Sequence, residues 1–268
     1  MSVSEWKARE KEQRRSDIVD AAEKLFFSKS YDEVSMDDIA KAIKLNKATL
    51  YRYFSSKEAL FFTVVLRGVK IEHEMLQRSL TQEGNGLERL FKLGMVYYDF
   101  ARQYPDYHRL VGYYASGRFD LCQMLRSEYE ILVPSDKYEE WARTAGTIES
   151  KKIDDIMNVP GISTPIDKHC KWVKPAETTE GEVVREISGL RWEMFDATRS
   201  MIKVGQEDGS IRLGLSPGEL AIFNGIIGNG LLNLSPDHRS LLDHMDIDRQ
   251  QFVERSRAFL YNMLANKD

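Results

Sequence analysis

The chain has 268 residues, of which 42% are apolar, and it carries a formal net charge of −4. These values are those of an ordinary globular protein with room for one large or two modest domains. Two cysteines do not make a disulfide framework or a zinc site. The N-terminus is charged within its first residues, unlike a signal peptide, and the longest apolar run (220–234) is interrupted by Asn224 and Asn229. We therefore expect a cytoplasmic protein that has no contact with a membrane.

Apolar residues recur at helical spacing over residues 16–28, which predicts an amphipathic helix there. The apolar stripe comprises Ile18, Ala21, Ala22, Leu25 and Phe26. Residues 1–15 are rich in helix formers and in lysine and arginine. They predict either a backward extension of this helix with a frayed, solvated end or a basic arm.

The stretch 35–57 predicts two short helices joined by a tight turn. Ser35 followed by Asp38 is a signature of a helix N-terminus, and apolar residues at helical spacing come next. Asn46 is a favourable N-cap, so we expect a second helix over residues 47–54. This order of elements is typical of a helix-turn-helix.

The second helix combines aromatic and basic side chains on its outer side. Leu50 and Phe54 are four residues apart and can face inward together. The side chains that then face solvent to varying degree are Lys47, Thr49, Tyr51, Arg52 and Tyr53. The chain has no Asp or Glu from residue 39 to residue 57, whereas it has Lys41, Lys44, Lys47, Arg52 and Lys57.

Duplex DNA is the polyanion that suits such a helix, because a helix-turn-helix places its second helix in the major groove with flanking cations on phosphates. A basic arm at residues 1–15 would then reach a minor groove. The alternative is a solvated basic surface that has no partner.

A long helix is expected next. Ser55 and Glu58 have the spacing of a capping box, and the apolar pattern continues to about Leu80. Lys57 lies in the first turn, where free backbone N–H groups and the helix dipole add to its own charge in holding a phosphate. A shift of this helix would move the DNA-reading helix.

A cluster of tyrosines follows, around a helix predicted from residue 87 to residue 104. The cluster comprises Tyr97, Tyr98, Tyr104, Tyr107, Tyr113 and Tyr114. Such side chains can line a pocket for an aromatic or amphipathic small molecule. The alternative is packing into the core with each hydroxyl satisfied. The ligand-binding candidates are Tyr97, Tyr98, Tyr113, Tyr114 and Met194.

Another helix is predicted at 119–132, after which residues 134–181 hold four of the seven prolines and have a loop-rich pattern. This stretch also contains Asp154, Asp155, His169 and Cys170. They do not predict a metal site, because an adjacent His and Cys cannot easily face one ion.

Helical patterns return over 182–205, 217–234 and 248–265. Gly225, Gly228 and Gly230 lie inside the second of these helices, and each costs up to about 1 kcal/mol relative to alanine. A close helix partner would offset this cost. The partner can belong to a second copy or to the same chain.

The N-terminal region resembles the DNA-binding domain of the tetracycline-repressor (TetR) family of regulators over about residues 14–62. The resemblance rests on Ile18, Ala22, Leu25, Phe26, Ile39, Ala40, TLYRYF at 49–54 and SKEALF at 56–61. The chain differs from the family pattern at Ser30, Lys44 and Ala48, where glycine is usual, and at Asn46, where serine or threonine is usual. Either Lys44 adopts a left-handed backbone conformation at a cost of about 1–2 kcal/mol, or the turn is reshaped.

The resemblance implies an all-α fold: an N-terminal three-helix helix-turn-helix DNA-binding domain at 1–60, then a larger helical ligand-binding and dimerisation domain at 61–268. Because family members are usually shorter, residues 134–181 are an expected insertion, either a lid over the pocket or a surface elaboration. The last two helices would form a dimer interface. The residues expected to contact DNA are Ser35, Met36, Asn46, Lys47, Ala48, Thr49, Tyr51, Arg52, Tyr53 and Lys57.

We therefore predict a DNA-binding transcriptional regulator without enzymatic activity or cofactor, namely a ligand-responsive repressor that binds a palindromic operator as a homodimer. Its expected partners are a double-stranded DNA operator and a small, largely apolar effector. One alternative is an enzyme with a helical catalytic domain fused to a DNA-binding head, although the sequence has no P-loop, GxSxG or HExxH motif. Another is an architectural DNA-binding protein that has no effector.

Overall fold

The computed structural model describes residues 2–80, 83–119, 179–212 and 214–266. Within them the regular secondary structure is α-helical, as predicted, apart from an isolated antiparallel bridge between Ile211 and Ala265. The helices are α1 (Val3–Ser28), α2 (Met36–Ala42), α3 (Lys47–Tyr51), α4 (Lys57–Ser79), α5 (Gly86–Gln103), α6 (Pro105–Tyr114), α11 (Thr179–Glu207), α12 (Pro217–Leu232), α13 (Pro236–His244) and α14 (Arg249–Leu264). None of the helices in these ranges combines the length and apolar character needed to cross a membrane.

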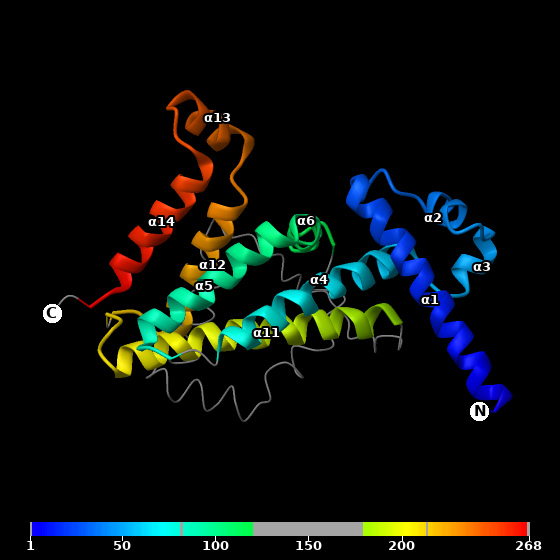
Figure 1. Cartoon of the computed structure of the whole chain (residues 1–268), viewed down its shortest axis with the longest axis horizontal. Helices are drawn as coiled ribbons and strands as arrows, with labels where there is room; N and C mark the ends of the chain where they lie inside the picture. Colours follow the sequence, from blue (N-terminus) through cyan, green and yellow to red (C-terminus); the bar gives the residue numbers. More distant parts are fainter. Residues whose placement is uncertain (1, 81–82, 120–178, 213, 267–268) are drawn as a thin grey trace, which may run out of the picture.

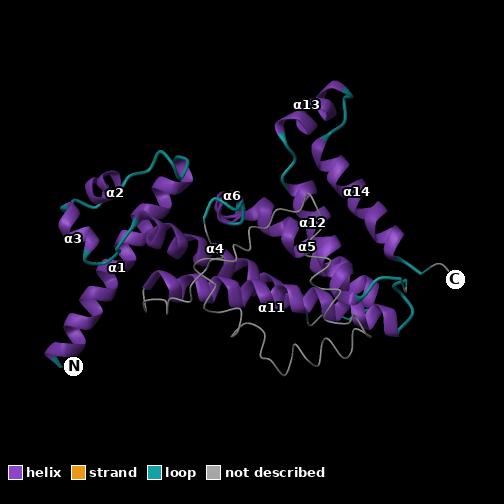
Figure 2. Ribbon diagram, turned by 180° about the vertical axis from the view of Figure 1, so that it is seen from behind, coloured by secondary structure: helices purple, strands orange, loops and turns teal. Residues whose placement is uncertain are grey.

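The head, formed by α1, α2 and α3, lies at one end of the molecule, and α12, α13 and α14 lie at the other end (Figure 1 and Figure 2). All the other helices, α4 to α14, are called the body. The helix α4 runs from the head into the body, where α11 and α5 pack against it. This arrangement places the head and the C-terminal helices far apart on one framework.

The helix α1 is continuous and begins well before the predicted start. The Ser2 hydroxyl accepts a hydrogen bond from the backbone N–H of Glu5, and the Glu5 carboxylate accepts one from the N–H of Ser2. This capping box stabilises the first turn, so the N-terminal segment is a helical extension rather than an extended arm. Ile18, Ala22 and Phe26 of the predicted stripe are fully buried.

The helix α4 connects the head to the body through a continuous apolar core. Its N-cap is Ser56, whose hydroxyl accepts a hydrogen bond from the N–H of Ala59 at 3.0 Å, so the predicted cap at Ser55 is wrong by one residue. Buried side chains form one cluster from Ile18 in α1, through α4, to Met194 in α11. The head is therefore packed on the body rather than tethered by a linker.

Two glycines allow helices of the body to approach closely. A Cβ atom at Gly68 of α4 would lie 2.9 Å from the ring of Tyr107 on α6. At the start of α5, a Cβ atom at Gly86 would overlap the backbone of Gly205 in α11. Larger side chains at these points would push α6 and α11 outward.

The C-terminal region has one helix that the sequence analysis missed. Between α12 and α14 the chain forms α13, which begins with Ser235 as N-cap and Pro236 in its first turn. Both residues are ordinary helix-start signals, and they could have indicated this helix. The helices α12 and α14 agree with their predicted ranges to within two residues at each end.

Several predictions fall outside the described residues. They include the helix at 119–132 except for Phe119, the residues Asp154, Asp155, His169 and Cys170, and the expected insertion at 134–181 except for residues 179–181, which belong to α11.

Candidate nucleic-acid interface and ligand cavity

A tight turn joins α2 to α3. The N–H of Leu45 donates to the carbonyl of Ala40 at 2.9 Å, which closes the turn behind α2. Lys44 has φ of 55°, so it adopts the left-handed conformation that the sequence comparison with the TetR pattern anticipated. Asn46 caps α3 as predicted, because its Oδ1 accepts a hydrogen bond from the N–H of Thr49 at 2.7 Å.

The helix α3 is shorter than predicted and ends at Tyr51 instead of Phe54. The N–H groups of Arg52 and Tyr53 donate to carbonyls three residues back, at 3.2 and 3.0 Å. Bonds of this spacing tighten the last turn of a helix. Leu50 and Phe54 nevertheless point into the core, as predicted.

Most of the predicted DNA-contacting residues lie on the outside of the helix-turn-helix. Tyr51 is 44% exposed. The others that are exposed are Ser35, Asn46, Lys47, Ala48 and Arg52, and those that are half-buried are Thr49, Tyr53 and Lys57. The expectation that Met36 contacts DNA is wrong, since Met36 is only 6% exposed and belongs to the core of the head. As the first residue of α2, it points inward with Ile39 and Ala40.

An acidic residue of α2 partly neutralises the positive charge of this surface. Lys47 forms an ion pair with Asp37 at 3.0 Å, and both side chains are about half exposed. The hydrogen bond and charge of Asp37 raise the pKa of Lys47. On the inner side, the guanidinium of Arg15 lies over the Phe54 ring, 4.7 Å from its centroid. Arg15 thus holds α1 against the end of the recognition segment.

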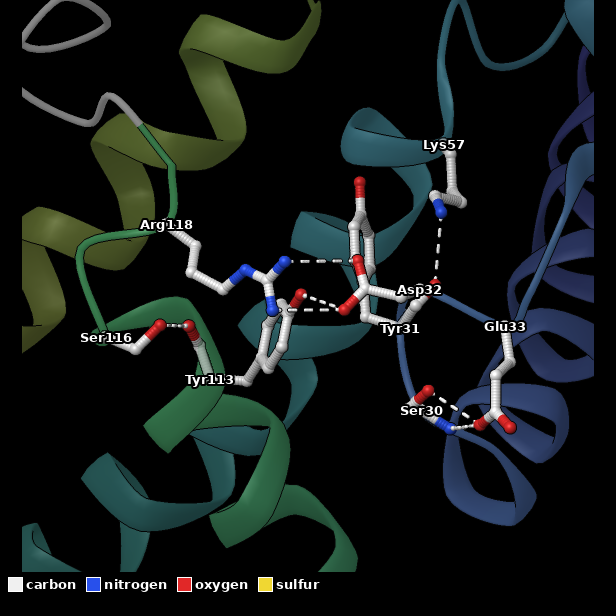
Figure 3. A network of polar contacts seen from close by, with 8 residues as sticks. All are labelled: Ser30, Tyr31, Asp32, Glu33, Lys57, Tyr113, Ser116 and Arg118. Carbon is white, nitrogen blue, oxygen red and sulfur yellow. Dashed lines mark hydrogen bonds and ion pairs between the residues drawn. The ribbon is translucent and has the colours of Figure 1, made fainter.

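Lys57 has partners within the head. Its Nζ donates to the backbone carbonyl of Tyr31 at 3.1 Å and lies 4.0 Å from the centroid of the Tyr31 ring (Figure 3). The Tyr31 hydroxyl in turn donates to the Glu58 carboxylate at 2.6 Å. The Lys57 side chain thus joins the loop between α1 and α2 to the start of α4.

The same loop is joined to the body by a polar network (Figure 3). Tyr113 on α6 donates its hydroxyl hydrogen to Asp32 at 3.1 Å, and Arg118 forms an ion pair with Asp32 at 3.1 Å. Further along α6, Arg109 donates to the carbonyls of Phe26 and Phe27 at the end of α1, at 2.9 and 3.0 Å. The sequence analysis missed this junction, because its partners lie more than 80 residues apart and share no local pattern.

A cavity of about 320 Å³ lies within the body. Helices α4, α5, α6, α11, α12 and α14 all contribute to its wall, which is mostly apolar and aromatic. Its size is at the lower end of the range typical of small-molecule sites. The polar side chains on the wall include Glu72, His108, Arg191, Thr198, Asn224 and Arg257. Burial, together with the charge of Arg249, lowers the pKa of His108.

The ligand-binding candidates separate into two groups. Tyr97, Tyr98 and Met194 line the cavity. Tyr113 and Tyr114 are not on its wall. Tyr113 packs at the junction with the head, with its ring 5.3 Å from that of Tyr31, and Tyr114 packs edge-on against Phe62. For these two tyrosines the alternative of core and junction packing is the correct one.

The helix-turn-helix segment matches a known family. Residues 18–64 match the family model described as "Bacterial regulatory proteins, tetR family". An uncharacterized HTH-type transcriptional regulator of Mycobacterium tuberculosis is 46% identical over 61 residues, which cover 22% of this chain and 30% of that protein. The HTH-type transcriptional activator FasR of Mycolicibacterium smegmatis is 28% identical over 101 residues, which cover 38% of this chain and 46% of that protein. The chain thus spans less than half the length of these relatives.

Solved structures extend the likeness to the whole fold. A tetR-family regulatory protein from Rhodococcus RHA1 superposes with a TM-score of 0.56 at 14% identity, over 95% of this chain and 98% of that chain. The ketosteroid transcriptional regulator KstR2 of Mycobacterium tuberculosis gives a TM-score of 0.54 at 14% identity, over 95% of this chain and 96% of that chain. At this identity the likeness concerns the fold alone.

The exposed, acid-poor recognition helix, capped by Asn46 and packed on a larger helical body, is the arrangement of a helix-turn-helix DNA-binding segment. The family match at residues 18–64 shows a DNA-binding segment similar to that of the tetR family, and the fold likeness extends over nearly the whole chain. Members of this family are transcriptional regulators, so the alternative of an enzyme fused to a DNA-binding head is not favoured.

Proposed function

We propose that the protein is a homodimeric transcriptional repressor that releases a palindromic DNA operator when a small molecule occupies the cavity of the body. The head and the start of α4, residues 1–60, would form the DNA-binding domain, and residues 61–268 would bind the effector and dimerise. The observation that carries the proposal is the position of α6, which lines the cavity with one face and contacts the head with another.

The recognition helix α3 would enter the major groove. Lys47, Ala48, Thr49 and Tyr51 would approach base edges, because they come from the N-terminal part and outer face of α3. The groups proposed to hold phosphates and the flanking backbone are Ser35, Asn46, Arg52, Tyr53 and Lys57. Arg52 supports this assignment, since it is exposed and has no ion pair within the described residues.

Dimerisation would use α12 and α14. Large apolar side chains on these helices face solvent, and the most exposed are Phe259 at 68% and Ile226 at 67%. Gly225, Gly228 and Gly230 have no neighbour within 4 Å of an added Cβ atom. The described part of this chain supplies no close helix partner at these glycines, and Gly225 and Gly228 line the cavity instead. A second copy is the partner that we propose for the exposed apolar side chains of α12 and α14.

The helix α6 offers a route from the cavity to the head. His108, Val111 and Gly112 line the cavity, whereas Arg109 and Tyr113 on the same short helix bind the end of α1 and the loop after it. A ligand that prefers a shifted α6 would thus disfavour the head position that fits DNA. The helix α4 adds a second route, since Glu72 reaches the cavity and the N-terminus of α4 adjoins α3.

The coupling must be reciprocal. Two heads have to remain about one helical turn of DNA apart, roughly 34–36 Å, to occupy successive major grooves. A ligand whose binding to the two head positions differs by about 1–3 kcal/mol would weaken DNA binding by about 5–150-fold, and DNA would weaken the ligand equally.

Selection of bound sequences from a random pool of DNA duplexes tests the proposal. We expect enriched sites with two inverted half-sites whose centres lie about one helical turn apart. The variant Tyr51→Ala should lose this enrichment, and Tyr104→Phe, which alters a tyrosine of the body, should keep it. The absence of enrichment with the parent protein, or enrichment of single half-sites alone, would contradict the proposed dimeric DNA reader.

A further inference from the structure

Two buried polar atoms in the described part of the chain have no hydrogen-bond partner, and both belong to residues on the wall of the same cavity. They are Oε2 of Glu72 and Nη2 of Arg257. Buried polar groups are almost always hydrogen-bonded, and each exception in a folded protein calls for an explanation. A ligand that supplies both missing partners explains the two exceptions together.

Glu72 lies on α4 and is only 8% exposed. Among the described residues that line the cavity, it is the single acidic side chain. Burial raises its pKa to about 7, and the charge of Arg191 opposes the rise. Arg191 lines the same cavity but is itself exposed, and it does not supply a partner for Oε2 of Glu72. A cationic donor beside Glu72 would therefore remove a large cost of burying a carboxylate.

Arg257 comes from α14, and its guanidinium offers N–H donors and no acceptor. Its guanidinium lies near the rings of Phe91 and Tyr98, at 5.8 and 5.5 Å from their centroids. Both rings belong to α5. Glu72 comes from a different helix, α4. Nη2 lacks an acceptor, so an anionic or carbonyl oxygen is the group that it would bind.

Apart from its polar side chains, the wall of the cavity is apolar and aromatic, with Tyr97, Met194 and Leu260 among its members. We propose that the cavity binds a small amphiphile with an amine at one end and a carboxylate at the other, the amine paired with Glu72, the carboxylate with Arg257, and an apolar chain between them. The proposal rests on the proposed function, since this ligand would be the effector.

This ligand differs from the largely apolar effector predicted from the sequence. An apolar molecule of the same shape would take water away from Glu72 and Arg257 without replacing its hydrogen bonds. A molecule with one charged end would leave the other residue unpaired. The two-ended molecule satisfies both, and a lost charge-assisted hydrogen bond reduces affinity by about tenfold or more.

Terminal (omega) amino acids of graded length test the proposal with the full-length protein. Calorimetric titration would compare aminohexanoate, aminooctanoate and aminododecanoate, each with its amine on the last carbon, against octylamine and octanoate. We expect at least one amino acid to bind about tenfold more tightly than either compound with a single charged end. Equal or tighter binding of octylamine or octanoate would overturn the proposal, and so would a lack of binding by every member of the series.

Variants identify the two ends of the ligand. Glu72→Gln and Arg257→Met should each weaken the best amino acid by about tenfold. Glu72→Gln should leave octanoate unaffected, and Arg257→Met should leave octylamine unaffected. The matched controls are Glu74→Gln and Arg255→Met, which change exposed residues on the same two helices and should bind like the parent. Equal losses in the controls and the test variants would overturn the assignment.

The proposed ligand class and the proposed regulatory role can be tested independently of each other. Fluorescence anisotropy of a selected operator duplex would follow DNA release by the best amino acid. Binding to the protein that follows the expected ranking, without release of DNA, would support the ligand class and contradict the proposed regulation. Release of DNA by octane-like apolar compounds, with no preference for amino acids, would support regulation and overturn the ligand class.

Discussion

The hydroxyl group of Tyr113 on α6 donates a hydrogen bond to the carboxylate of Asp32, in the loop between α1 and α2, at 3.1 Å. The same carboxylate is paired with Arg118. Through this contact the helix that lines the cavity holds the loop that precedes the helix-turn-helix. The position of α6 and the position of the head are therefore linked by side chains, in addition to the shared core.

Removal of the Tyr113 hydroxyl should loosen this loop without disturbing the ring packing. We expect Tyr113→Phe to speed amide hydrogen exchange in residues 30–34 by roughly two- to tenfold, the effect of losing a hydrogen bond of about 0.5–1.5 kcal/mol. Tyr104→Phe is the control, because the Tyr104 hydroxyl has no hydrogen bond within the described residues. Equal exchange in the two variants would show that the contact does not hold the loop.

Lys57 is expected to act on DNA as well as on Tyr31. If it contacts a phosphate, Lys57→Ala should weaken binding to all duplexes alike and reduce the slope of log affinity against log salt by about one. Lys203→Ala removes an exposed lysine of α11 that is paired with Glu207, and it should not change the slope. Because Lys57 also braces the head, thermal unfolding of each variant should accompany the titrations. An unchanged slope in a folded Lys57→Ala protein would reject the phosphate contact.

The exposed face of α12 and α14 should hold two copies together. Phe259→Asp would place a charge in the centre of the proposed interface, where its desolvation is unfavourable, and we expect sedimentation to detect monomers. Leu215→Asp is the matched control, since Leu215 is 50% exposed and precedes α12. A monomeric parent protein would refute the interface, as would a Phe259→Asp variant that remains dimeric.

The left-handed conformation of Lys44 should carry a measurable strain. Glycine lacks the Cβ atom that makes φ of 55° unfavourable, so Lys44→Gly should raise the free energy of unfolding by up to about 1 kcal/mol. Lys41→Gly, three residues earlier in α2, should instead lower it by about 1 kcal/mol, because glycine is unfavourable within a helix. Denaturant unfolding would measure both. Destabilisation by both substitutions would mean that the Lys44 side chain has a stabilising role that outweighs its backbone strain.

Buried Glu72 should make stability depend on pH. Its pKa rises from 4.5 in a solvated chain to about 7 in the folded protein, so the folded state binds the proton more tightly. Stability should therefore decrease as pH rises from 4.5 to 7, and the loss should be complete above 7. Glu72→Gln should remove this dependence and be more stable than the parent above pH 7, by at most about 3 kcal/mol. Glu74→Gln should retain it. Parallel pH profiles of Glu72→Gln and the parent would contradict the burial of an ionisable Glu72.

Much of the local structure of the head can be predicted from short-range residue patterns. The caps at Ser35 and at Asn46 depend on contacts within four residues. Such features follow from residue type and spacing. The buried stripe of α1 follows in the same way from helical periodicity. The tetR-family pattern at residues 18–64 is also local, so it can be recognised from the sequence without knowledge of any long-range contact.

Which side chains are exposed or paired depends instead on how the helices pack. Met36 was expected to contact DNA, but the packing of α1 and α2 buries it. Tyr113 is separated from its partner Asp32 by 81 residues, and the Tyr261 hydroxyl from the Leu90 carbonyl by 171. The cavity between Glu72 and Arg257 likewise exists only because helices from both halves of the chain surround it. Neither spacing nor composition encodes such pairings, because each depends on how whole helices pack and on which polar groups that packing removes from water.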